Sequence, residues 1–93
     1  MSLIEQILAK LKECQKDYYS RHNAVEAYQT LSNNMPDIKF NSEKSFIVFE
    51  ENLAKLKQSM SIADQDLFAQ NFASACLNLT LALRIAHSTS QTY

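Results

Sequence analysis

The absence of glycine is the feature that most constrains how this chain can fold. The 93 residues contain no glycine and a single proline, Pro36. Glycine adopts positive φ without a steric penalty, and β-hairpin turns and bulges depend on it for that reason. Loops that cradle phosphate groups need glycine as well, because the backbone must approach the phosphate closely. The composition therefore predicts an all-α protein and excludes the glycine-dependent nucleotide-binding motifs.

The size and charge of the chain narrow the range of functions. Ninety-three residues are the size of one domain, and 46% of them are hydrophobic, as in ordinary globular proteins. Nine basic and ten acidic residues leave a net charge of −1 with the histidines neutral. Such a balance provides no electrostatic attraction to nucleic acid or to an anionic membrane. We expect a single domain over residues 1–93 with neither of these as a partner.

The apolar segments do not fit a secretory or membrane protein. Residues 1–17 include Glu5 and several lysines where a signal peptide has an uninterrupted apolar stretch. Residues 67–83 are uncharged but contain five polar side chains, too many for a membrane-spanning helix. The cysteines, Cys14 and Cys76, are too few for a disulfide framework. We therefore expect a cytoplasmic protein.

Apolar periodicity predicts a long first helix over about residues 2–31. In a 3.5-residue repeat, seven of eight seam positions are apolar or aromatic, and Arg21 is the exception. Ser2 with Glu5 has the spacing of a capping box at the N-terminus. The seam positions are Ile4, Ile7, Leu11, Cys14, Tyr18, Arg21, Val25 and Tyr28.

Two further helices are expected, over about 42–60 and 62–87, followed by a polar tail at 88–93. The apolar pattern loses its phase near Ser61, and Ser61 with Asp64 has the spacing of a new capping box. A break is therefore predicted there. One helix continuous through this point remains an alternative, because neither glycine nor proline enforces the break.

These helices predict an antiparallel three-helix bundle with a long first helix, a shorter second helix and an apolar third helix. A short second helix cannot cover the whole length of the other two, so apolar surface is left over. A second copy of the chain, in a two-fold dimer, is the simplest way to cover it. We expect a homo-oligomer, or association with another helical protein.

The third expected helix has apolar residues on two sides. Leu77, Leu81 and Ile85 lie opposite its core face, and Arg84 is its only charged residue from Leu67 onward. A surface helix in a small monomer normally has several charges on its solvent face. Tyr19, which lies off the seam of the first helix, joins these residues as a candidate partner-binding residue. An ordinary surface with scattered leucines is the alternative.

The residue types that support catalysis or metal binding are sparse. His22 and Glu26 have helical spacing, but a carboxylate-bridged metal site in a helical bundle needs several such pairs. Cys14 and Cys76 fall on expected core faces, without a nearby base or helix N-terminus to activate a thiolate. We expect no catalytic, cofactor-binding or metal-binding residues and no enzymatic activity.

The favoured function is non-enzymatic protein binding, as a small chaperone, adaptor or inhibitor that acts through the apolar face of the third helix. A small helical nucleic-acid-binding regulator is the alternative of a different class. The lysines of the first helix alternate with acidic residues, which is typical of a solvated face and does not match a phosphate-binding stripe.

Overall fold

The computed structural model describes residues 1–91, and these form an all-α fold. Its helices are α1 (Leu3–Cys14), α2 (Arg21–Asn34), α3 (Glu43–Ser59) and α4 (Gln65–Gln91), with a short 3₁₀ turn η1 (Met35–Asp37) after α2. Within this part of the chain there is no strand. The sequence-based expectation of an all-α protein is confirmed.

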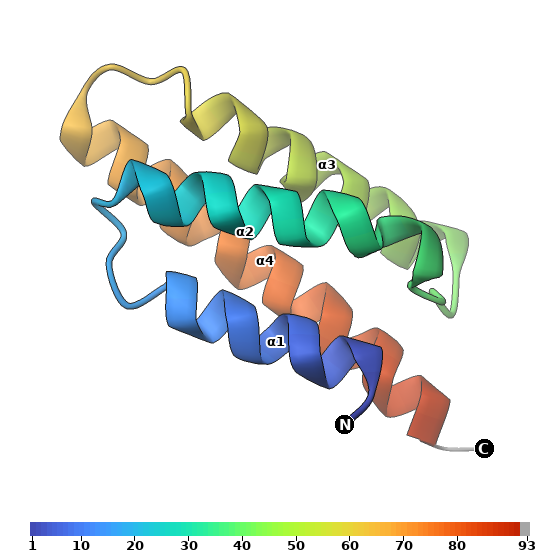
Figure 1. Ribbon diagram of the computed structural model, residues 1–93. Coiled ribbons are helices and arrows are strands. Elements are labelled where there is room, and N and C mark those ends of the chain that lie inside the picture. Colours follow the sequence, from blue (N-terminus) through green and yellow to red (C-terminus); the bar gives the residue numbers. More distant parts are fainter. Residues whose placement is uncertain (92–93) are drawn as a thin grey trace.

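The four helices of the described chain run alternately in opposite directions (Figure 1). Contacts join α1 to α2, α2 to α3, α3 to α4, and α4 back to α1. Helix α4 has 27 residues and is therefore about 40 Å long, close to the 44 Å maximum dimension of the molecule. The other helices are shorter, so they cover α4 in sections.

The expected first helix over 2–31 is wrong, and with it the three-helix bundle. The helix ends at Cys14, and a new helix begins at Arg21 and runs back along it. The Ser20 hydroxyl accepts a 3.1 Å hydrogen bond from the Asn23 backbone N–H and caps α2. The Asn23 side chain donates a 3.2 Å bond to the Cys14 carbonyl at the end of α1. Polar side chains thus stabilise both ends of a turn that needs no glycine.

The turn changes which residues of the second segment are buried. Val25, which was a seam residue of the predicted continuous helix, is 39% exposed, whereas Ala24, Ala27 and Leu31 are buried. A new helix has its own rotational phase, so the seam of α1 does not continue into α2.

The helix starts agree in part with the capping patterns. In the predicted capping box, the Glu5 N–H donates to the Ser2 hydroxyl and the Ser2 N–H donates to the Glu5 carboxylate. The predicted break before α4 is present, so the continuous-helix alternative is wrong. Its cap is Asp64, whose carboxylate accepts a 2.8 Å bond from the Leu67 N–H, and Ser61 instead donates to the Gln58 carbonyl.

The end of α4 differs from the expectation as well. The sequence pattern places it at residue 87, with a polar tail at 88–93, but α4 continues to Gln91. Residues 92–93 of the expected tail lie outside the described residues.

The register of α3 against α4 is set by a row of polar contacts. Asn78 donates its side-chain amide to Asn52 at 3.1 Å, and the Lys55 ammonium donates to the Ser74 hydroxyl at 2.9 Å. One turn further, the Asn71 amide donates to the fully buried Ser59 hydroxyl at 2.6 Å. A sliding motion of one helix would break all three contacts, so the row positions the side chains next to it.

Candidate partner-binding groove

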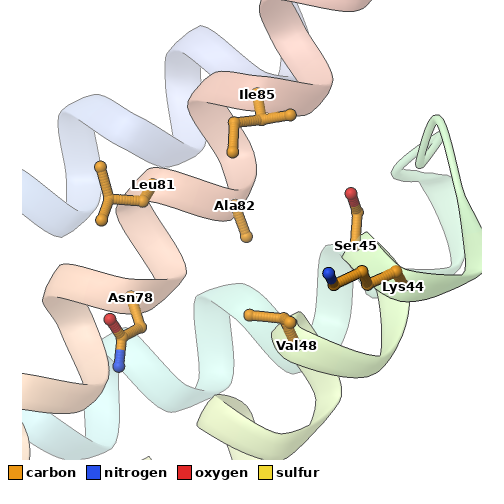
Figure 2. A pocket seen from close by; sticks show the side chains of 7 residues that line it. All are labelled: Lys44, Ser45, Val48, Asn78, Leu81, Ala82 and Ile85. Atoms are coloured by element: carbon orange, nitrogen blue, oxygen red, sulfur yellow. The ribbon is translucent and has the colours of Figure 1, made fainter.

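A groove of about 320 Å³ lies between the first half of α3 and the second half of α4 (Figure 2). Its side chains come from two segments far apart in the sequence, and most of the surface they present is apolar. The residues that line it are Lys44, Ser45, Val48, Asn78, Leu81, Ala82 and Ile85.

The α4 wall of the groove follows from the spacing of its apolar residues. Leu77, Leu81 and Ile85 are four residues apart, so they share one face of the helix, and Leu81 and Ile85 of this face line the groove. Their exposed fractions are 61%, 48% and 52%. Leu79 and Leu83 point the opposite way and are fully buried. Helix α4 is therefore apolar on two sides, and only one of them is covered by the described residues of the other helices.

The groove exists because small side chains line its floor. Ala82 is 5% exposed and lies between the two walls, and Ser45 lies on the α3 side. Val48, which is 37% exposed, forms the opposite wall. Lys44 and Asn78 add polar groups along the edges.

Val48 and Lys44 were not identified from the sequence. The apolar seam of the second expected helix left Ile47 and Val48 outside it, and both are exposed. Two adjacent apolar residues outside the seam could have indicated an exposed apolar surface on this helix. The sequence does not show that Val48 faces α4 because this depends on how the two helices pack.

Of the four candidate partner-binding residues, Leu81 and Ile85 line the groove, whereas Leu77 and Tyr19 do not. Tyr19 lies at the other end of α4. Its hydroxyl donates a 3.2 Å hydrogen bond to Asp66, and its carbonyl accepts a 2.9 Å bond from the Gln65 side chain. Asp66 is fifteen residues from Leu81, or about 22 Å along α4. Although Tyr19 is 53% exposed, its contacts attach the turn between α1 and α2 to the beginning of α4.

Arg21 contributes to the same attachment. Its guanidinium lies 4.3 Å from the centre of the Phe68 ring, a cation–π arrangement. It also donates a 3.2 Å hydrogen bond to the Gln65 side chain. The one charged residue of the expected seam thus packs against a buried aromatic ring of α4.

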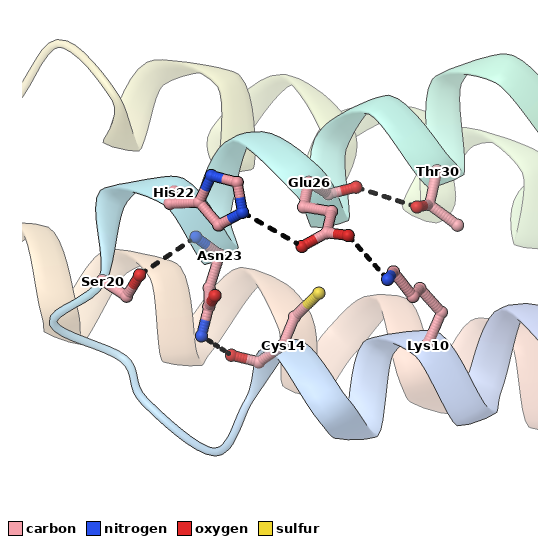
Figure 3. Close-up of polar contacts among 7 residues, drawn as sticks. All are labelled: Lys10, Cys14, Ser20, His22, Asn23, Glu26 and Thr30. Atoms are coloured by element: carbon pink, nitrogen blue, oxygen red, sulfur yellow. Dashed lines mark hydrogen bonds and ion pairs between the residues drawn. The ribbon is translucent and has the colours of Figure 1, made fainter.

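His22 and Glu26 belong to a cluster of polar side chains between α1 and α2 (Figure 3). The Lys10 ammonium lies 2.6 Å from one Glu26 oxygen, and His22 Nε2 lies 3.5 Å from the other. The hydrogen bond from Lys10 lowers the pKa of Glu26. Within residues 1–91, no group of three or more His, Cys, Asp or Glu side chains is arranged to hold a metal ion.

The two cysteines are buried and their thiols resist ionisation. Burial raises the pKa of the Cys76 thiol to about 12 and also raises the pKa of Cys14. Both are free cysteines, and Cys76 is 0% exposed. Since the thiolate is the reactive form, these residues act as apolar packing groups at neutral pH.

Comparison with known proteins gives no family to which the groove can be referred. No protein-family model matches the chain, and no match is found among curated proteins or among solved structures. No helix in the described part of the chain is both long and apolar enough to cross a membrane.

Proposed function

We propose that this protein is a non-enzymatic protein-binding module and that its binding surface is the groove between α3 and α4. The observation that carries the proposal is a cluster of exposed apolar side chains: Leu81 and Ile85 from α4 and Val48 from α3 line the groove, and Leu77 lies one turn before Leu81 on the same face of α4. Grouped apolar side chains around a concave surface are typical of protein interaction sites.

Covering this cluster contributes part of the free energy of binding to a partner. Full burial of an aliphatic side chain is worth about 1.5–3 kcal/mol, and these four side chains are between about a third and two thirds exposed. Covering them therefore contributes on the order of 4 kcal/mol before the costs of association. A helix with apolar residues at four-residue spacing fits such a groove, as in helix-in-groove recognition. Small chaperones, adaptors and inhibitors use this kind of contact.

Nucleic-acid binding receives less support from the same surface. Lys44 is the only cation among the groove residues, and Lys10 on α1 is paired with Glu26. A surface that follows phosphates needs several unpaired cations in a row. The proposed partner is accordingly a protein.

The substitution Leu81→Glu tests the function, with Leu67→Glu as its matched control. Both leucines lie on α4 and are about half exposed, but Leu67 is outside the groove. Immobilised wild-type and variant chains are exposed to an extract of the source cells, and the retained proteins are quantified by mass spectrometry. We expect Leu81→Glu to lose proteins that both wild type and Leu67→Glu retain. Identical retention by all three chains would refute the groove as a binding surface.

A further inference from the structure

We infer that the occupant of the groove is a second copy of this chain, docked antiparallel about a two-fold axis that passes beside Val48. This inference rests on the proposed function, since it names the partner of the same surface. The observation behind it is that a single position of the axis suits both the charged residues of α3 and the exposed apolar residues of α4.

The register between the two helices defines which residues lie side by side. Asn52 is level with Asn78, Lys55 with Ser74, and Ser59 with Asn71. One turn beyond the first of these pairs, Val48 is level with Ala82, and both line the groove. Positions on α3 can therefore be projected onto α4 to within about one residue, or 1.5 Å.

Helix α3 presents opposite charges on either side of Val48. Lys44 and Glu51 are seven residues apart, two turns of helix, and both are exposed on the same side of α3. The midpoint between them lies beside Val48. A two-fold axis at this point brings Lys44 of each copy opposite Glu51 of the other, so two ion pairs form and no like charges meet along α3.

The same axis pairs the apolar residues of α4. The midpoint between Leu81 and Ile85 is Leu83, one residue from Ala82 and so level with the midpoint on α3. Leu81 of one copy then packs against Ile85 of the other. Arg84, the only charged residue near this contact on α4, is exposed and does not line the groove. One axis thus satisfies both patterns, which a surface for an unrelated partner has no reason to do.

The surface is small compared with that of a stable protein interface. It extends about 20 Å along the helices and about 20 Å across the two of them, or on the order of 400 Å² per copy. A standard interface covers about 800 Å² per partner, and smaller ones are characteristic of weak association. The dimer is therefore expected to form and dissociate with concentration.

Sedimentation equilibrium of the purified chain, from about 1 µM to about 1 mM, tests the inference. We expect the mass to rise from the 10.6 kDa of the monomer towards twice that value. Lys44→Glu and Glu51→Lys each replace both ion pairs by like-charge pairs and weaken the dimer about tenfold or more. An equimolar mixture of these two variants restores association. One variant then has glutamate at both positions and the other has lysine at both, so two ion pairs form between them. Circular dichroism verifies that the variants are folded.

The outcomes separate this inference from the proposed function. A wild-type chain that stays monomeric over the whole range overturns the dimer, and a mixture no stronger than its components overturns the pairing of Lys44 with Glu51. In either case the function stands if Leu81→Glu, and not Leu67→Glu, loses retained proteins. Association that persists unchanged in Leu81→Glu would show that copies meet elsewhere, and this also overturns the inference.

Discussion

Leu79 and Leu81 are two positions apart on α4, and the same substitution at each distinguishes the core face from the exposed face. Leu79 is fully buried, while Leu81 is 48% exposed and lines the groove. We predict that Leu81→Ala costs much less folding stability than Leu79→Ala, although it removes the same atoms.

The magnitudes follow from the two exposures. Replacing leucine by alanine removes the equivalent of about three methylene groups, worth about 2.4 kcal/mol when fully buried. Because about half of Leu81 is already in contact with water, Leu81→Ala should cost about 1 kcal/mol. Leu79→Ala loses all of this burial free energy and also leaves a cavity. We therefore expect it to lower the free energy of unfolding by about 3–5 kcal/mol.

Urea unfolding followed by circular dichroism measures both costs. The experiment is run at a low micromolar concentration, so that association contributes little to the apparent stability. With an m-value of about 1.5 kcal/mol per molar urea, the two variants should differ in midpoint by more than about 1 M. If Leu81→Ala lowers the midpoint as far as Leu79→Ala, the Leu81 side chain is part of the folding core. The groove would then not be a surface available to a partner.

Three further predictions concern the features that hold the helices in place. Ser20→Ala removes the N-cap of α2 and should cost about 1 kcal/mol by urea unfolding, whereas an unchanged midpoint would contradict the account of the turn. The lowered pKa of Glu26 means that its pair with Lys10 stabilises the fold above the ordinary carboxyl pKa and is lost as pH falls through the lower folded value. Glu26→Gln should therefore lose less stability than wild type between neutral and acidic pH, and parallel pH profiles would refute the contribution of the pair. Cys76, whose pKa is raised to about 12 by burial, should react with iodoacetamide at mildly alkaline pH only at the rate of unfolding, and rapid labelling of the native chain would contradict its burial.

The break between α1 and α2 shows why the fold was only partly predictable. Its sequence signals, Ser20 and Asn23, are common residues that also occur within helices, and no glycine or proline marks the turn. The apolar repeat continued through it by chance, with Tyr18 at a seam position within the turn and Tyr28 at one in α2. Tertiary contacts distinguish the turn from a continuous helix, among them the bond from the Asn23 side chain to the end of α1 and the bond from Gln65 of α4 to the Tyr19 carbonyl.

The break before α4 was predictable because two signals agreed there. The apolar phase changed, and capping residues stood at the same place. Which residue serves as the cap was decided by the folded backbone, in which Asp64 precedes the first turn of α4. The capping pattern predicted Ser61 as the cap and Asp64 as its partner, and residue type alone did not show otherwise, since serine and aspartate are both good N-caps.

The sequence by itself determined the all-α class, through the missing glycine, and it placed Leu77, Leu81 and Ile85 on one side of a helix, through their four-residue spacing. Both inferences are local, because they depend on backbone preference and helical periodicity. The tertiary structure decided that Val48 and Lys44 line the same groove as Leu81 and Ile85 and that Tyr19 lies at the other end of α4. Such proximity depends on the register between α3 and α4, which is set by hydrogen bonds between residues 12 to 26 positions apart in the chain.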